Sequence, residues 1–217
     1  MLAIPSRAQE KEVEKKEEKT SSMFSFKGLE LSADIAGFAY RLIGEYTSAE
    51  IALEANFGNR LYPAVEFGYG WCNTTDETTG ITYKSAAPYY KAGINYNFST
   101  TKENTDPDYS ILGLARIGWT SCKYDVDAPP ITDPVWGGTS ALQLSNVKGS
   151  ALWAEVGVSL KARIYKNFHM GWSVRYKVRI KDKKGSNSDM WYIPGYGINE
   201  STCFGGTYSL IYEIPFK

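Results

Sequence analysis

The sequence predicts an all-β protein, an eight-stranded antiparallel up-and-down transmembrane β-barrel. Three observations carry this prediction. Eight stretches after residue 26 alternate apolar with polar or small side chains at a period of two, and none has the period of a helix. Each stretch is about as long as a tilted membrane strand, roughly 9 to 11 residues. The connections alternate largely between short turns and long loops, as in outer-membrane barrels.

The composition agrees with this fold class. The chain has 217 residues, with 24 Lys plus Arg against 24 Asp plus Glu, so no overall field attracts polyanions. Aromatic residues make up 14%, with 16 Tyr, and such a composition favours β structure. No run approaches 18 apolar residues, so the sequence predicts no transmembrane helix.

The first 26 residues differ in character from the rest. Residues 1–8 resemble the end of a secretory signal, with the small residues Ser6 and Ala8 before a cut at Gln9. Residues 9–26 mix both charges without apolar periodicity, which predicts a flexible periplasmic linker. An ordinary disordered tail and a short helix are the respective alternatives. The predicted barrel domain is 27–217.

The first strand changes parity part-way along. Apolar side chains take odd positions from 29 to 35 and even positions from 38 to 42. One inserted residue restores the pattern, so the sequence predicts a β-bulge near Gly37.

The other seven strands keep one parity each. Their predicted ranges are 47–57, 61–72, 89–98, 111–119, 152–164, 168–181 and 202–216. Short turns follow the second and sixth strands, and long loops are predicted at residues 73–87, 125–149 and 183–198. Eight strands then place both chain ends at the end of the short turns, which is the periplasmic end of such barrels.

One face of these strands is free of charge and the other is rich in it. A Lys or Arg facing lipid at the membrane midplane would cost about 2 to 4 kcal/mol. We therefore expect the charged parity to face the lumen and to form an ion-pair network between acid-rich strands two and three and base-rich strands six and seven. Eight strands leave room only for side chains, so a filled lumen without an open pore is predicted. The predicted network consists of Asp34, Glu50, Glu54, Glu66, Glu155, Glu213, Lys91, Arg116, Lys161, Arg163, Arg175, Lys177 and Arg179.

The basic row at residues 161–181 suggests a nucleic-acid groove at first sight. In a strand, however, Trp172 and Tyr176 point away from the cations. This excludes a nucleic-acid groove lined by alternating basic and aromatic side chains. His169, the only histidine, lacks a nucleophile and an orienting acid in any known motif. The sequence therefore predicts no catalytic residues, no metal site and no cofactor.

Two loop segments carry exposed-type aromatic residues beside Pro and Gly. Residues 127–140 and 191–197 are predicted to bind a ligand or to fold over the barrel mouth as a cap. The candidate residues are Trp136, Trp191, Tyr192 and Tyr196. The cysteines Cys72, Cys122 and Cys203 fall near the outer rim on the inward parity, where one disulfide or buried thiols are the alternatives.

Several strings in the chain resemble a known family. They are "DPVWGGT" at 133–139, "WAEV" at 153–156, "KNFHMGWSVRYK" at 166–177 and "PGYGINESTCFGGTYSLIYEI" at 194–214. They are similar to a family of small outer-membrane β-barrels of diderm bacteria of the domain-of-unknown-function type. The likeness to the OmpA barrel and the OmpX group is one of architecture only. The resemblance implies fold and location and transfers no catalytic residue; it departs from the usual barrel end in that Lys217 follows Phe216.

The leading interpretation is a monomeric outer-membrane barrel with a charge-filled lumen and a structural or surface-interaction role through its long outer loops. Its partners would be outer-membrane lipids and the barrel-assembly machinery during insertion, with no nucleic acid. The alternatives are a lipid-modifying outer-membrane enzyme, a small-solute porin and a soluble periplasmic ligand-binding barrel. The last has the opposite pattern, with an apolar interior.

Overall fold

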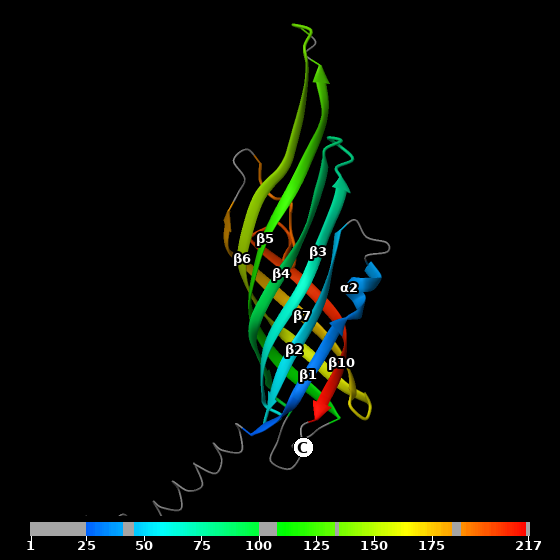
Figure 1. Cartoon of the computed structure of the whole chain (residues 1–217), viewed down its shortest axis with the longest axis vertical. Coiled ribbons are helices and arrows are strands. Elements are labelled where there is room, and N and C mark those ends of the chain that lie inside the picture. The colour runs from blue at the N-terminus through cyan, green and yellow to red at the C-terminus, as the bar shows by residue number, and fades with distance from the viewer. Residues whose placement is uncertain (1–24, 41–45, 100–107, 133–134, 184–187, 216–217) are drawn as a thin grey trace, which may run out of the picture.

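The computed structural model describes residues 25–40, 46–99, 108–132, 135–183 and 188–215. Their backbone forms a closed ring of eight antiparallel strands, drawn in Figure 1, in the order β1-β10-β7-β6-β5-β4-β3-β2. Consecutive wall strands are neighbours throughout, and β1 closes the ring on β10 through pairs such as Leu31 with Tyr212. The eight-stranded up-and-down barrel predicted from the alternation is confirmed. The predicted signal remnant and nearly all of the predicted linker lie outside the described residues.

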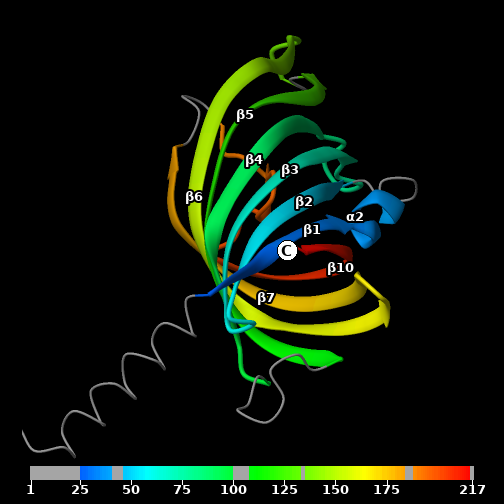
Figure 2. The same cartoon turned by 60° about the horizontal axis from the view of Figure 1, so that its bottom comes forward.

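The wall strands differ widely in length. They are β1 (Phe26–Asp34), β2 (Tyr46–Phe57), β3 (Leu61–Thr75), β4 (Thr82–Asn97), β5 (Tyr109–Thr132), β6 (Thr139–Tyr165), β7 (Phe168–Lys183) and β10 (Thr202–Pro215). The short pair β8 (Tyr192–Ile193) and β9 (Gly197–Ile198) forms a separate two-stranded sheet. Figure 2 shows the ring from an angle closer to its axis, with β5 and β6 extending beyond the rest.

The first strand ends in a helix and not in a bulge near Gly37, so that prediction is wrong. Helix α2 (Ile35–Tyr40) follows β1 directly, and the helical period explains the change of apolar parity. The Asp34 carboxylate accepts a hydrogen bond from the N–H of Ala36 at 3.1 Å, as a helix-capping side chain does. Thr47 Oγ1 donates to the Gly37 carbonyl at 3.0 Å and ties the helix to β2. No helix in the described part of the chain is long and apolar enough to cross a membrane.

Three wall strands run far beyond their predicted limits, and β3 and β7 exceed theirs slightly. β4 begins at Thr82, β5 reaches Thr132 and β6 begins at Thr139, so much of two predicted long loops is paired sheet. Thr82 pairs with Asp127, which pairs in turn with Gln143. The pairing continues because the side chains keep alternating past the rim, with Tyr83 buried inside and Lys84 exposed outside.

Short turns lie at one end of the barrel and a long hairpin projects from the other. The short β2–β3 turn has Gly58 and Asn59 at φ 60 and 56°, the left-handed pair that a tight hairpin requires. Lys166, at φ 46°, makes the β6–β7 turn. The beginning of β1 and the end of β10 lie at this end, and the β5–β6 hairpin projects from the other (Figure 1).

The two faces of the wall have opposite chemistry. The outer face carries exposed apolar side chains along every wall strand, for example Phe67 on β3, Ile117 on β5 and Val174 on β7. The inner face buries polar and charged groups, among them Glu66, Arg116 and Glu155 at 1 to 3% exposure. This pattern is the inverse of that in a soluble barrel.

Candidate functional site

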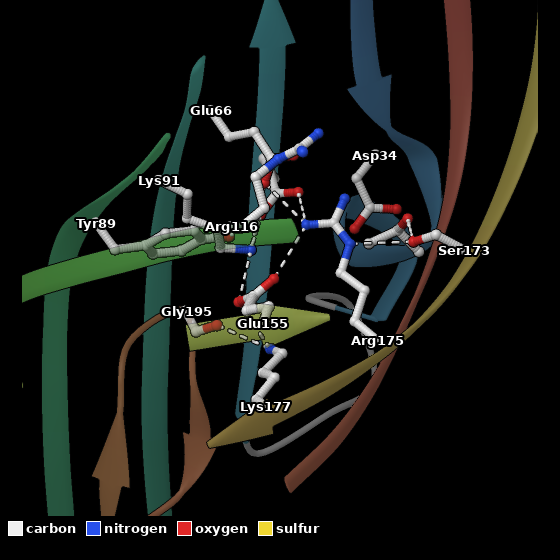
Figure 3. Close-up of polar contacts among 12 residues, drawn as sticks. Asp34, Glu66, Tyr89, Lys91, Arg116, Glu155, Ser173, Arg175, Lys177 and Gly195 are labelled. Atoms are coloured by element: carbon white, nitrogen blue, oxygen red, sulfur yellow. Dashed lines mark hydrogen bonds and ion pairs between the residues drawn. The ribbon is translucent and has the colours of Figure 1, made fainter. Parts of the chain in front are cut away.

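Six charged side chains from six different strands meet near the middle of the barrel. This central cluster consists of Glu50 on β2, Glu66 on β3, Lys91 on β4, Arg116 on β5, Glu155 on β6 and Arg175 on β7. Figure 3 shows five of them, labelled, converging from opposite walls. Three acids meet three bases, so the cluster is formally neutral.

Glu66 joins both arginines of the central cluster. Its Oε1 lies 2.8 Å from Arg116 Nε, and its Oε2 lies 2.8 Å from Arg175 Nη1. The Arg175 contact spans the lumen from β3 to β7, whereas Arg116 comes from β5. Lys91 Nζ lies 3.6 Å from the same Oε2 and is paired with Glu66 across neighbouring strands.

Glu50 and Glu155 complete the coordination of Lys91 and Arg175. Lys91 Nζ is 2.6 Å from Glu50 Oε2 and 3.3 Å from Glu155 Oε1. Arg175 Nη1 is 3.3 Å from Glu50 Oε1 and from Glu155 Oε2. Every charge therefore has at least two opposite partners or a charged partner plus hydrogen bonds, which is what an ion pair needs to survive burial.

The sequence predicts ion pairs between acid-rich strands two and three and base-rich strands six and seven, and the central cluster also contains pairs between neighbouring strands. Glu155 lies on β6, among the predicted bases, and it pairs in register with Arg116 on β5. Lys91 on β4 lies beside Glu66. Opposite charges therefore pair between neighbouring strands as well as across the lumen, and such cross-strand pairs of unlike charge are stabilising.

The segment 188–200, which we call the plug, folds back into the barrel mouth between β7 and β10. Within it Met190, Tyr192, Ile193 and Tyr196 are all buried. They pack against wall residues in one hydrophobic core. The wall members of that core are Cys72, Tyr83, Ala87, Tyr89, Cys122, Tyr124, Val126, Ala151 and Trp153.

Hydrogen bonds fix the plug to three wall strands, β2, β4 and β5. Tyr83 Oη donates to the Tyr192 carbonyl at 3.2 Å, and Tyr192 Oη donates to the Thr47 carbonyl at 3.3 Å. Tyr124 Oη donates to the Ser188 carbonyl at 2.6 Å. The bonds to backbone carbonyls satisfy groups that would otherwise be buried without partners.

The plug approaches the wall so closely that glycine is required at the contacts. A Cβ on Gly195, at φ +81°, would lie 2.4 Å from the Tyr89 ring. A Cβ on Gly70 of β3 would lie 2.8 Å from Pro194. Real Cβ atoms do not make such contacts, so any larger side chain must push the plug away from the wall.

The plug and the central cluster are joined into one structure. Lys177 Nζ donates to the carbonyls of Gly195 at 2.8 Å and Tyr196 at 3.0 Å, and it lies 4.0 Å from Glu155. Trp153 Nε1 donates to Glu155 Oε1 at 2.7 Å. Disturbing either part should therefore disturb the other.

The family of the chain follows from its whole length. A family model described as Domain of unknown function (DUF6048) matches residues 1–217. The chain belongs to this family. No curated protein sequence matches the DUF6048 chain.

Solved structures similar to the DUF6048 chain are bacterial surface and outer-membrane proteins. A major outer membrane protein from Thermus thermophilus is 13% identical, with 87% of this chain and 99% of that chain covered, at a TM-score of 0.46. Ail, the attachment invasion locus protein of Yersinia pestis, is 13% identical, with 87% and 94% covered, at 0.40. Neisserial surface protein A is 15% identical, with 88% and 96% covered, at 0.39.

The other charged residues singled out from the sequence lie outside the central cluster of the DUF6048 barrel. Glu54 lies at its edge, 3.7 Å from Arg116 Nη2, and accepts a hydrogen bond from Asn95 at 2.7 Å. Asp34 caps α2 and also accepts from the N–H of Tyr208 at 3.2 Å. Arg179 lies near the outer mouth beside Asn199 and Asp182.

A second polar layer lies toward the short turns. Lys161 Nζ lies 2.6 Å from Glu30 Oε1, and His169 Nε2 lies 3.2 Å from Glu213 Oε2. Arg163 lies 3.3 Å from Asp108 in a more exposed position. Glu30 was absent from the predicted set although it has the inward parity of Asp34, so the parity rule applied strictly to the first strand would have found it.

The four predicted cap residues separate into two places. Tyr192 and Tyr196 are buried in the plug, and Trp191 stacks on Tyr83 with ring centroids 5.6 Å apart. Trp136 is 88% exposed at the tip of the β5–β6 hairpin. For Trp136 the cap alternative is therefore wrong and the loop-interaction alternative stays a prediction, because β5 and β6 remain paired as far as Thr132 and Thr139 and hold the tip away from the mouth.

No disulfide joins the three cysteines of the DUF6048 barrel, all of which lie in the described residues. Cys72 and Cys122 are buried and Cys203 is half-buried. The buried-thiol alternative therefore holds for the first two, and the disulfide alternative is wrong. Burial makes such thiols behave as small apolar groups of the mouth core.

The described part of the interior leaves little free volume. A polar cavity of about 40 Å³ lies beside the central cluster, and one of about 20 Å³ lies in the layer around Lys161. Such volumes hold a few water molecules at most. No group of three or more His, Cys, Asp or Glu side chains in the described residues could hold a metal ion.

Proposed function

We propose that this protein is a monomeric outer-membrane barrel with a closed interior and that it acts in envelope structure or surface interaction through its outer hairpins. The observation that carries the proposal is the inversion of the fold: charges are buried inside a ring whose outside is apolar. Outer-membrane lipids would contact the outer face, and the barrel-assembly machinery would insert the chain.

The exposed apolar belt supports a lipid environment. Soluble monomers rarely expose contiguous apolar patches larger than a few hundred Å². Here apolar side chains cover all eight wall strands, for example Leu53, Val65, Ile94, Val156 and Leu210. A soluble periplasmic barrel would leave this whole belt in water, whereas a bilayer covers it.

Aromatic pairs at both ends of the apolar belt also support a position across the membrane. Tyr69 and Trp71 lie with ring centroids 4.8 Å apart near the mouth. Phe168 and Tyr212 lie 4.9 Å apart near the short turns. Aromatic girdles at both interfaces are typical of outer-membrane barrels. Such barrels also have short periplasmic turns and longer extracellular loops, so the hairpin end would be extracellular and the turn end periplasmic.

Fractionation tests the location. The mature protein is expected to stay with outer membranes through a high-salt, detergent-free wash and to enter solution only with detergent, because the outer belt needs an apolar solvent. Recovery in the soluble periplasmic fraction after that wash would reject the membrane proposal. A membrane protein without a barrel and a soluble periplasmic protein are the controls.

Planar bilayers test the closed interior. The purified protein is expected to give no steady conductance at 100 mV in 1 M salt, because the central cluster and the plug block the lumen at two levels. A stable open channel in the unaltered protein would favour the small-solute porin alternative.

The lipid-modifying alternative needs Ser and His near the outer face, whereas His169 is buried inside beside Glu213.

A further inference from the structure

The outer half of β6 has an unpaired edge. Within the described residues β7 pairs with β6 only from Ser150 to Tyr165, and no strand pairs with the other side of Thr139–Gly149. An edge strand presents a row of free N–H and C=O groups that can bind a further strand. This edge lies on the hairpin that projects beyond the barrel (Figures 1 and 2).

A bulge divides this edge into two parts. Tyr124 pairs with Val147 but Val126 pairs with Leu144, so Ser145 and Asn146 together oppose a single residue. Asn146 has φ 57°, and its N–H donates to Asp125 Oδ1 at 2.7 Å. This bulge separates Thr139–Leu144 from the rest of the unpaired edge. A second register shift places Pro129 and Pro130 of β5 opposite Ala141, so the extra residue there belongs to β5 and Thr139–Leu144 has none of its own. Six residues are the usual length of a strand.

The sequence protects the opposite edge of the hairpin and leaves this one unprotected. β5 is unpaired with β4 beyond Asp127, and there it carries Pro129 and Pro130, which donate no N–H. Thr139–Leu144 reads TSALQL and contains neither proline nor charge. Natural edge strands usually carry proline or charged side chains that prevent pairing with another chain. The β6 edge of this hairpin lacks both, whereas the β5 edge carries two prolines.

The two faces beside the edge differ in chemistry. One face carries Leu144, which packs against the mouth core, and Leu142, which is 55% exposed. The other carries Gln143, whose side chain donates to Asp127 Oδ1 at 3.2 Å. Residues 124–147 contain acidic residues and no Lys or Arg. A strand added here would meet apolar side chains on one face and acidic or polar ones on the other.

We propose that the Thr139–Leu144 edge binds an extended segment of another polypeptide by strand addition, with apolar residues of that segment alternating with basic ones. Main-chain hydrogen bonds would supply affinity, and the two faces would select the alternation. The proposal deepens the surface role proposed above and rests on it for its biological setting.

Peptide binding to the full-length protein in detergent tests the edge directly. The probe is a synthetic ten-residue peptide that alternates valine and lysine, labelled for fluorescence anisotropy. Saturable binding is expected, with slower amide hydrogen exchange in Thr139–Leu144. A peptide of equal charge with its two central valines replaced by proline is expected to bind at least tenfold more weakly. Equal binding of the two peptides would show plain charge attraction and overturn the proposal.

Two variants with the same added charge locate the site. Gln143→Lys places an ammonium at the edge and is expected to weaken binding at least tenfold. Ile131→Lys, one strand away on the same hairpin, is expected to change it less than threefold. Equal effects of the two would overturn the edge assignment, and so would dimerisation of the chain through Thr139–Leu144, which would make a second copy the occupant.

The failure of this inference can be told from failure of the surface role. Protease added to intact cells is expected to cut the β5–β6 hairpin if it is displayed outside. A hairpin that is cut on cells but does not bind the peptide in detergent overturns the edge proposal alone. A hairpin that is protected on intact cells and cut only after lysis overturns the surface role itself.

Discussion

Glu66→Ala is expected to lower the free energy of unfolding of the barrel by about 3 to 5 kcal/mol, the usual cost of breaking a buried ion pair from one side. The Glu66 carboxylate is the shared partner of Arg116, Arg175 and Lys91. Its removal leaves three cations against two acids in the central cluster, away from water. Urea unfolding in detergent, followed by the mobility shift between folded and unfolded barrel, measures the loss.

Matched variants separate charge from shape. Arg175→Ala should cost a similar amount, because Glu50, Glu66 and Glu155 all face its guanidinium. Val174→Leu, on the outer face of the same strand, should cost less than about 1.5 kcal/mol. The Glu66→Ala/Arg175→Ala double variant should lose less than the sum of the singles, because each removes a partner of the other. Additive losses, or losses no larger than that of Val174→Leu, would refute a stabilising cluster.

The alternation in the sequence suffices to predict the barrel and the side of the wall on which each charge lies. It predicts that Glu66 and Arg175 point inward, because a period of two assigns every residue of a strand to one face. It does not predict which inward charges meet at one depth in the barrel. Arg163 and Arg179 have the same parity as Arg175, yet they lie toward opposite ends of the barrel, beside Asp108 and Asn199. Depth depends on the stagger of neighbouring strands, which the pattern of one strand does not contain.

Neither the helix nor the plug could be predicted from the period of two. A change of parity near Gly37 is produced equally by an extra strand residue or by a turn of helix, and contacts with another strand, such as that between Thr47 and Gly37, are not visible in the pattern. The plug has no alternation, because its backbone is held by side chains such as Tyr83 and Tyr124 from distant strands. Its Gly and Pro content indicated close packing over the mouth, but not how deep it enters.

Gly195→Val is expected to displace the plug and to open the mouth of the barrel. The new side chain would need φ +81°, a conformation that costs a β-branched residue about 1 to 2 kcal/mol, and its Cβ would enter the Tyr89 ring. Overpacking typically adds about 1 to 3 kcal/mol. The bonds from Lys177 to the carbonyls of Gly195 and Tyr196 would be lost as the segment moves away.

Limited proteolysis and conductance report the displacement separately. In the variant, residues 188–200 should become sensitive to protease, and brief channel openings should become more frequent than in the unaltered protein. Gly138→Ala is the matched control, because a Cβ there meets nothing within 4 Å. If the plug in Gly195→Val resists protease and the conductance is unchanged, the close contact between Gly195 and the Tyr89 ring does not hold the plug in place. Protease sensitivity without conductance would instead show that the central cluster, in which Glu66 joins Lys91 and Arg175, closes the lumen without the plug.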